Sequence, residues 1–362
     1  MTTVGGHGLI PDSDDRAEVA QARVLAALDG GALALLLAIG HQTGLLDTMA
    51  TRARVSTAEL AVTSGCERSY VRAWLVGMAS AGVVDHHDDT DEWELPRSVA
   101  GLVSRDGGAR NIAAFAQTIP VLAENLERVG DCFHHGGGLA PSRTSHMRTL
   151  ASELTGVNYD ERLIDTVLAS IPGLLGALHE GIRVVDLGCG SGRAVNLIAE
   201  TFTFCDVVGY DIARDGIAVA AAEAATRGAD NARFETADVR SVAEPGTFDL
   251  AMTLFSAFHQ PDPAGVLRAA HRLLRSGGRL LLGDSVRLTT EQYADPNATF
   301  TSVMQCMYVL PSLSVGGEGE ERDVPDEDEI VEALVAAGFV DVEVLRPERA
   351  PIGVGYVTAV RP

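Results

Sequence analysis

The stretch VVDLGCGSGRAVNLIAE, Val184 to Glu200, decides the fold of this chain. An apolar run is followed at once by Gly188, Gly190 and Gly192, which alternate with small residues, and then by a helical pattern. Glycine has no Cβ, so the backbone can turn sharply here and a ligand can approach it closely. In an open parallel sheet, ligands bind beyond the carboxyl ends of the strands. The stretch therefore predicts a strand, a ligand-binding turn and a helix.

The sequence around this stretch predicts an α/β domain. The apolar runs RVVDL, DVVGYD, ARFETAD, TFDLAMTL and GRLLLGD alternate with helical stretches such as 214–227 and 263–275. This alternation is typical of a parallel sheet covered by helices on both faces. The final runs, VDVEVLR and GYVTAVRP, are joined too tightly for a crossover helix, so the last strand should be antiparallel. We predict a doubly wound, seven-stranded sheet over residues 181–362.

Two acids follow the next strands at positions suited to an adenosine. Asp211 closes the second strand, where its carboxylate can accept both hydroxyls of a ribose. Asp238 follows the third strand, where it can accept the exocyclic amine of adenine. The helix N-terminus at Gly192–Arg193 favours a carboxylate on the ligand. A dinucleotide-dependent oxidoreductase matches less well, because the third glycine of G-x-G-x-x-G falls on Arg193.

The motifs VVDLGCGSG, VVGYD, RFETADV, FDLAMTL and LLRSGGRLLLGD together resemble class I S-adenosylmethionine-dependent methyltransferases. The resemblance implies S-adenosyl-L-methionine as cofactor, S-adenosyl-L-homocysteine as product, and the methyltransferase form of the seven-stranded sheet. The cofactor-binding positions that it implies are Asp186, Gly188, Cys189, Gly190, Gly192, Asp211, Ile212, Asp238, Val239 and Phe255.

The front of the chain predicts a mostly α-helical winged-helix domain. Ser56 and Glu59 form a capping-box pattern, and a short helix reaches Gly65. A second helix ends at Gly82, and the strand-like runs VVDHH and EWELP flank an acidic turn. We therefore predict three parts: a winged-helix and dimerisation domain at 1–100, a helical linker that covers the substrate at 101–180, and the cofactor-binding domain at 181–362.

Composition limits the partners. The 362 residues include no lysine, which excludes Schiff-base chemistry and a P-loop. Their formal charge of −22 disfavours binding to nucleic acid and to anionic membranes. The five cysteines show no CxxC spacing, and the pair His134-His135 has no further ligand nearby, so we expect free thiols, a loop at 134–138 and no metal. The N-terminus lacks a signal core, and the apolar run Gly31–Gly40 is too short to span a bilayer, so we expect a cytoplasmic protein.

His259 is the candidate catalytic residue, as a base or as a residue that orients the substrate. Some two-domain relatives have an Asp-Ala-Ile-His-Asp-Gln-like run after the fourth strand, and here the run is Ser256-Ala257-Phe258-His259-Gln260. The histidine is kept but both acids are replaced, which leaves an acid-assisted histidine in question. A structural role for His259 is the alternative.

A lid-like insertion is expected at 285–324. Met304, Met307 and Tyr308 fall on one face of a helix at normal α-helical spacing, and with Phe258 they are the candidate substrate-binding residues. Such a stripe can equally belong to a core. The sequence thus predicts methyl transfer to a small aromatic acceptor, an indole or a phenol, at carbon, nitrogen or oxygen.

The winged helix raises an alternative function, a DNA-binding regulator with a vestigial or sensory cofactor domain. A DNA-reading module should have a basic face. Its recognition-helix candidate carries only Arg68 and Arg72, and the wing DHHDDTDE is strongly acidic. We therefore expect the apolar helices at 17–50 to pair with a second subunit, which predicts a homodimer.

Overall fold

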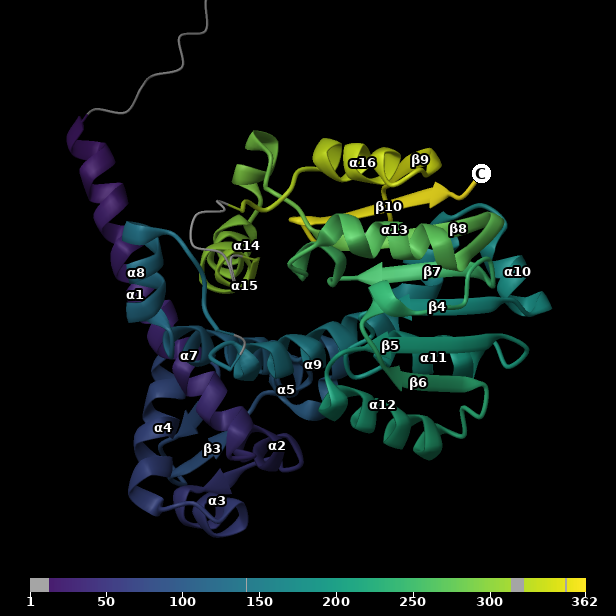
Figure 1. Cartoon of the computed structure of the whole chain (residues 1–362). Coiled ribbons are helices and arrows are strands. Elements are labelled where there is room, and N and C mark those ends of the chain that lie inside the picture. The colour runs from purple at the N-terminus through teal and green to yellow at the C-terminus, as the bar shows by residue number, and fades with distance from the viewer. Residues whose placement is uncertain (1–12, 141, 314–321, 349) are drawn as a thin grey trace, which may run out of the picture. The chain divides into compact units, whose positions relative to one another are not determined.

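The structure is a computed structural model that describes residues 13–140, 142–313, 322–348 and 350–362. The chain divides into two compact units, Met1–Val121 and Leu122–Pro362, whose elements are labelled in Figure 1. Each unit has its own core, and each is described by itself.

The first unit is mostly helical, with a small antiparallel sheet in the order β1-β3-β2. Its elements are α1 (Ser13–Gln42), α2 (Leu45–Ala50), β1 (Val55–Ser56), α3 (Thr57–Ser64), α4 (Arg68–Ser80), β2 (Asp85–His87), β3 (Glu92–Glu94), α5 (Arg97–Val103), a 3₁₀ segment (Arg105–Arg110) and α6 (Ile112–Ala116), and α7 (Thr118–Ala123) crosses the boundary between the units. The predicted helix, turn, helix and hairpin are all present.

Local chemistry sets the ends of these helices. The Ser56 side chain accepts the Glu59 N–H and the Glu59 carboxylate accepts the Ser56 N–H, which completes the predicted capping box. Gly65 ends α3 in the left-handed conformation, with φ 68°. Two tryptophans fix the core: the Trp74 indole donates to the Leu36 carbonyl at 2.8 Å, and the Trp93 indole donates to Thr57 Oγ1 at 3.0 Å.

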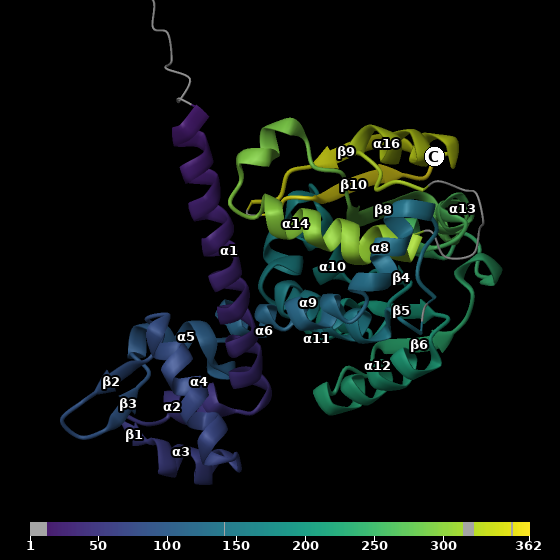
Figure 2. The same cartoon turned by 90° about the vertical axis from the view of Figure 1, so that its left-hand side faces the viewer.

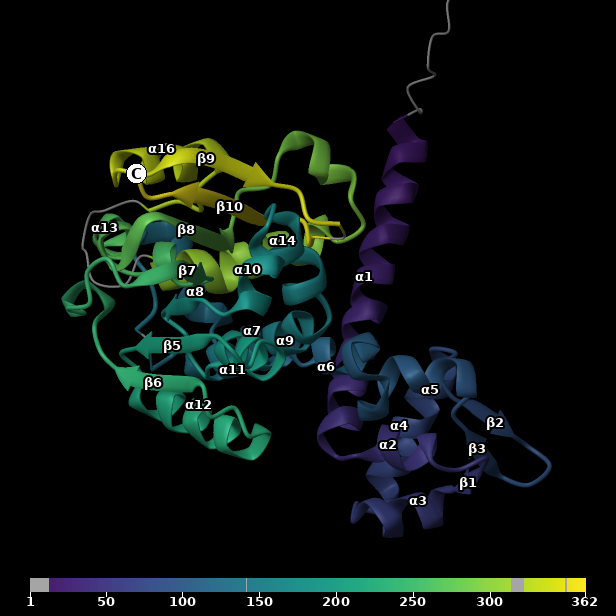
Figure 3. The ribbon, with the colours of Figure 1, turned by 90° about the vertical axis from the view of Figure 1, so that its right-hand side faces the viewer.

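Helix α1 is longer than the apolar run in the sequence. Figures 2 and 3 show it as one continuous helix whose N-terminal half extends beyond the rest of the first unit. Over Arg16–Gln42 it is long and apolar enough to cross a membrane by length and composition, and only 6% of its most apolar window is buried. The length argument based on Gly31–Gly40 is therefore wrong, because the helix continues through Ala and Leu residues on the N-terminal side.

The second unit begins with helices and continues as an alternating α/β domain. Its helical part comprises α8 (Leu126–His135), α9 (Ser145–Arg162), a π-helical turn (Leu163–Val167), a 3₁₀ turn (Leu168–Ser170) and α10 (Leu174–Glu180). His134 and His135 form the last turn of α8, and the loop starts only at Gly136, so the prediction of a loop at the two histidines is wrong. Gly136, with φ 67°, ends the helix.

The sheet of the second unit has seven strands in the order β6-β5-β4-β7-β8-β10-β9, as Figure 1 shows. The strands are β4 (Arg183–Leu187), β5 (Asp206–Asp211), β6 (Ala232–Thr236), β7 (Phe248–Leu254), β8 (Leu274–Ser285), β9 (Val340–Leu345) and β10 (Val354–Val360). The pairs from β6 to β8 are parallel, and β10 is antiparallel to both β8 and β9. This confirms the predicted doubly wound sheet with an antiparallel last strand.

Alternate residues of each central strand face two different cores. Val184, Val207 and Leu250 pack with α10, α11 (Arg193–Thr201) and part of α12 (Arg214–Arg227) on one face. On the other face, Val185 and Val208 pack with α13 (Pro263–Leu273) and α16 (Glu327–Ala336). Burial on both faces explains why these strands are apolar throughout rather than alternating.

The predicted lid region is helical where the structure describes it. It contains a 3₁₀ turn (Thr290–Ala294), α14 (Ala298–Met304), a π-helical turn (Gln305–Val309) and α15 (Leu310–Leu313). The rest of the expected insertion includes residues 314–321, which lie outside the described residues.

Candidate functional site

The glycine turn lies at the switch point of the sheet, where β4 has β5 on one side and β7 on the other. Gly188 has φ 85°, and a Cβ placed on it would lie 1.8 Å from Ser256 Oγ, the hydroxyl of the turn after β7. Gly192 has φ 75°, and its Cβ would lie 2.5 Å from the ring of Phe234. Only glycine allows this turn to pack so closely against Ser256 and Phe234, so the turn forms a backbone cradle.

Asp211 holds this cradle from the end of β5. Its Oδ2 accepts the Gly190 N–H at 2.8 Å, and its Oδ1 accepts the Ala213 N–H at 2.8 Å. Each carboxylate oxygen can accept a further hydrogen bond. Asp211 is therefore placed to accept two ligand hydroxyls while it fixes the glycine turn. Ile212, next along the chain, is 65% exposed.

Asp186 is a buried acid on β4 with an unsatisfied oxygen. The residue is 3% exposed, and among the described residues no donor reaches its Oδ1. Burial, together with the negative charge of Asp211, raises the pKa of Asp186 to about 7. A buried acceptor without a donor is costly, so the position suits a ligand that brings a cationic N–H group.

Asp238 is already engaged within the chain. Its carboxylate accepts the backbone N–H of Arg240 at 2.9 Å and the Nε–H of the same residue at 3.0 Å, and these hydrogen bonds lower its pKa. Val239, the next residue, is buried. The predicted contact with an adenine amine would therefore be shared with Arg240, a partner that the sequence reasoning missed.

Cys189 and Phe255 contribute to the site in different ways. The Cys189 thiol packs toward β5, where a Cβ on Gly209 would lie 2.7 Å from Sγ, and burial raises the pKa of the thiol. The thiol therefore packs against β5, and Cys189 contributes only its backbone to the glycine turn. Phe255 has φ 54°, an uncommon conformation for a non-glycine residue, and its N–H donates to the Gly283 carbonyl at 2.6 Å. Such strain is often found at functional sites.

His259 has an acidic neighbour that the sequence reasoning missed. Its Nε2 lies 3.3 Å from Oδ1 of Asp284, which is 1% exposed at the end of β8. Asp284 also accepts the Ser285 N–H at 2.8 Å and the Phe258 N–H at 3.2 Å, so its carboxylate is fixed. An acid of the neighbouring strand therefore lies beside His259, although both acids of the run Ser256–Gln260 are replaced. The available signal was that β7 and β8 are consecutive, and parallel neighbours end at the same edge of a sheet.

Two tyrosines also lie near these acids. Burial, and then the charges of Tyr356, Asp186 and Asp284, raise the pKa of Tyr159 on α9 well above its usual value. Burial likewise raises the pKa of Tyr356 on β10, a residue that pairs with Gly283. Both phenols therefore remain protonated and available as hydrogen-bond donors.

The predicted substrate-binding residues are only half-buried, and they do not share the expected helix. Met304 ends α14, whereas Met307 and Tyr308 belong to the π-helical turn, so the 3.6-residue spacing that placed all three on one face does not hold. Tyr308 packs against Val309 and its neighbours, and burial raises its pKa. Phe258 packs on the core formed with α13 and α16. Their contact with a substrate remains a prediction.

Among the described residues, no group of three or more His, Cys, Asp or Glu side chains is arranged to hold a metal ion. All five cysteines are free thiols.

Comparisons with known proteins identify two matching family models. Residues 178–331 match a family model described as a methyltransferase domain, and residues 31–105 match an Rv2258c-like winged HTH domain. The ubiquinone biosynthesis O-methyltransferase of Pseudomonas aeruginosa is 34% identical over 137 residues, which cover 38% of this chain and 55% of that protein. The chain thus spans about half the length of the curated relatives it matches.

Two solved structures cover almost the whole chain. The mitomycin 7-O-methyltransferase MmcR has a TM-score of 0.71 at 18% identity, over 97% of this chain and 100% of that one. Human N-acetylserotonin methyltransferase, in complex with SAM, has a TM-score of 0.71 at 14% identity, over 98% and 99%. At these identities the likeness establishes the fold.

Proposed function

We propose that this chain transfers a methyl group from S-adenosylmethionine to the hydroxyl of a small aromatic acceptor, because residues 178–331 match a methyltransferase-domain model and residues 31–105 match a winged helix-turn-helix model. The observation that carries the proposal is the donor site. It has a glycine cradle, Asp211 at its edge, and the unsatisfied buried oxygen of Asp186 beneath it.

The chain's own groups fit this cofactor. Asp211 would accept the ribose hydroxyls, Asp186 the ammonium group, and the N-terminus of α11 would face the carboxylate. Asp238, shared with Arg240, would accept the adenine amine. When bound, the cofactor supplies an electrophilic methyl group, so the protein must align the acceptor, exclude water and take up a proton.

His259 is proposed as the residue that takes up the proton. The Asp284 carboxylate at 3.3 Å favours the tautomer with the proton on Nε2, which leaves Nδ1 to accept one from the acceptor. Nε2 is buried and has no hydrogen-bond partner among the described residues, so its contact with Asp284 is an electrostatic one. Asp284 would then stabilise the imidazolium that forms.

We favour an oxygen atom of the acceptor over carbon or nitrogen as the methylated atom, for two reasons. A hydroxyl must lose its proton to become a good nucleophile, and a histidine beside a buried carboxylate can take up that proton. The relatives named above also include O-methyltransferases. The test is a screen of phenols and indoles for formation of S-adenosylhomocysteine, with the methylated atom located by NMR. Turnover of indoles alone would contradict O-methylation.

The DNA-binding alternative receives no support from the winged helix. The β2–β3 hairpin, which would be the wing, carries a run of acids, and the Asp88 side chain is 98% exposed. Phosphate backbones repel such a surface. We therefore propose that the unit serves in assembly and not in binding nucleic acid.

Proton linkage at Asp186 tests the donor site. A bound ammonium group favours the charged carboxylate, so binding of S-adenosylhomocysteine should lower the pKa of Asp186 from about 7 and release a proton. Affinity should therefore fall as the pH drops below about 7, by up to about tenfold per pH unit. Calorimetry at pH 6.5, in two buffers of different ionisation enthalpy, should show proton release for the wild type and none for Asp186→Asn.

The same shift predicts the sign of the stability change in the free protein. The folded-state pKa of about 7 lies above the value of about 4 for an unfolded Asp, so the folded state binds the extra proton. Stability from this group is then present below pH 4 and is lost as the pH rises from about 4 to 7. Asp186→Asn should remove this loss in thermal unfolding, whereas an unchanged pH profile would contradict it.

Helix α1 carries the proposed homodimer contact. Leu33, Leu36 and Leu37 pack inward against the core of the first unit. The other side presents exposed residues at alternating spacings of three and four, which we call the α1 seam: Leu25, Leu28, Ala32, Leu35 and Ile39. This is the spacing of a coiled-coil seam. A second copy of the chain presents the same seam, so the two can pair in a self-complementary contact.

Replacing Leu28 and Leu35 together by Asp should convert the dimer to a monomer, because buried unpaired charges oppose the contact. Light scattering should give about twice 38.0 kDa for the wild type and 38.0 kDa for the variant. Val62→Asp is the matched control, since Val62 on α3 is 83% exposed and lies off the seam. A wild type that is already monomeric would refute the seam contact.

A further inference from the structure

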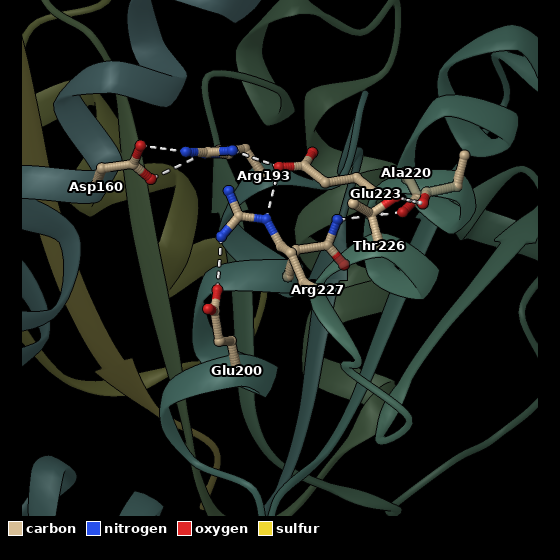
Figure 4. Close-up of polar contacts among 9 residues, drawn as sticks. Asp160, Arg193, Glu200, Ala220, Glu223, Thr226 and Arg227 are labelled. Carbon is tan, nitrogen blue, oxygen red and sulfur yellow. Dashed lines mark hydrogen bonds and ion pairs between the residues drawn. The ribbon is translucent and has the colours of Figure 1, made fainter. Parts of the chain in front are cut away.

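Three helices of the second unit are joined by a chain of ion pairs, drawn in Figure 4. Arg193 donates from Nε to Asp160 Oδ1 at 2.9 Å and from Nη2 to Asp160 Oδ2, so it grips the α9 carboxylate with two hydrogen bonds. Its Nη1 donates to Glu223 on α12. Arg227 then donates to Glu223 at 2.9 Å and to Glu200 at 2.6 Å.

The position of Arg193 is unusual for a cation. It is the first residue of α11 and directly follows Gly192 of the glycine turn. A helix N-terminus favours negative charge, so an arginine here does not serve the stability of its own helix. Its guanidinium is neutralised by two carboxylates of other helices, as Figure 4 shows.

The carboxylate that Arg193 grips lies next to Tyr159. Tyr159 packs on the core that also includes Phe255, Cys189 and Tyr356, and the charges of Asp186 and Asp284 act on its phenol. The last turn of α9 therefore borders the donor site. The residues Leu163, Val167 and Leu168 that follow are buried, and the ion pair to Asp160 is one polar contact that holds the turn before them.

We propose that Arg193 is a positioning residue that retains the cofactor product. By binding Asp160 it holds the last turn of α9, and with it Tyr159, close to Asp186 of the donor site and to Asp284. Release of S-adenosylhomocysteine then requires that this turn move, so the ion pair sets the lifetime of the complex. Glu223 keeps the guanidinium in place. The inference rests on the proposed function, because it assumes that this cofactor occupies the site.

The test measures dissociation of S-adenosylhomocysteine from the immobilised full-length protein by surface plasmon resonance. Arg193→Gln and Asp160→Asn should each raise the dissociation rate about tenfold, which corresponds to about 1.4 kcal/mol. The double variant should be no faster than either single one, because both remove the same contact. Arg193→Lys should lie between wild type and Arg193→Gln, since lysine keeps the charge without the two-pronged geometry.

Arg227→Gln is the matched control. It removes the neighbouring ion pairs to Glu223 and Glu200 but leaves the contact with Asp160 in place. Its dissociation rate should stay within about twofold of the wild type. Amide exchange across α9 in the ligand-free protein should be faster in Arg193→Gln and unchanged in Arg227→Gln, which separates positioning from a general loss of stability.

The outcomes are distinguishable. Equal dissociation rates in Arg193→Gln and Arg227→Gln, or additive effects of Asp160→Asn and Arg193→Gln, would overturn the inference and leave the proposed function standing. No binding of S-adenosylhomocysteine by the wild type would instead overturn the proposed function, and this inference with it.

Discussion

Replacing His259 by Ala is expected to lower kcat for a phenolic acceptor by about 10²–10⁴-fold, the usual contribution of a general base. Asp284→Asn should lower it as well, because the amide no longer stabilises the imidazolium at 3.3 Å. Neither change should weaken binding of S-adenosylhomocysteine by more than a few fold. Initial rates at saturating cofactor, with binding measured in parallel by calorimetry, check both statements.

A structural role for His259 predicts a different pattern. If the histidine only packs, its loss should affect all acceptors alike. If it removes a proton, acidic phenols such as nitrophenols, which ionise without help, should recover much of the rate in His259→Ala. His179→Ala is the matched control, since that imidazole packs edge-on against Phe202 and lies on α10, away from the glycine turn. Equal losses for acidic and ordinary phenols would refute proton transfer by His259.

Replacing Asp211 by Ala is expected to weaken S-adenosylhomocysteine binding at least tenfold, about 1.4 kcal/mol. Hydrogen bonds to a charged group contribute about 1.5–3 kcal/mol each, so losing both ribose contacts can exceed this lower bound. The variant also frees the Gly190 and Ala213 N–H groups that the carboxylate now holds. Calorimetric titration of wild type and variant measures the change.

Two further variants separate these effects. Asp211→Asn keeps one acceptor oxygen and should fall between the wild type and Asp211→Ala. Asp230→Ala is the control, because Asp230 is an exposed acid in the turn before β6, at the opposite end of the strands from the glycine turn. Micromolar binding in the wild type that survives Asp211→Ala unchanged would remove Asp211 from the site.

The sheet could be predicted because its determinants are local. Apolar runs bounded by glycine and acidic residues specify buried strands, and the crossover lengths between them specify parallel pairing. The short link between the last two runs specified an antiparallel pair, and β9 and β10 confirm it. The positions of Asp186 and Asp211 relative to the glycine turn follow from the same local order.

The length of α1 and the phase of the helical segment at Met304–Tyr308 could not be predicted from the sequence. The sequence pattern predicted apolar helices at 17–50, and only the structure shows that α1 runs unbroken from Ser13 to Gln42 with one side exposed. The stripe Met304, Met307 and Tyr308 assumed α-helical spacing, whereas a π-helical turn intervenes. Each hydrogen bond of a π-helix spans one residue more than in an α-helix, which alters the phase, and the composition of Gln305–Val309 does not indicate this change.

What the sequence alone determined was the backbone frame: a winged helix, a doubly wound sheet and a glycine turn with two acids. What only the tertiary structure decided was which side chains meet. Asp284 lies beside His259 because β7 and β8 are neighbouring strands. Arg240 forms an ion pair with Asp238, and Arg193 forms one with Asp160 of α9, a helix much earlier in the chain. The physical reason is the distance along the chain over which each feature is determined. Backbone conformation follows from neighbours within a few residues, whereas pairing between side chains depends on strand register and helix packing, which only the whole fold sets.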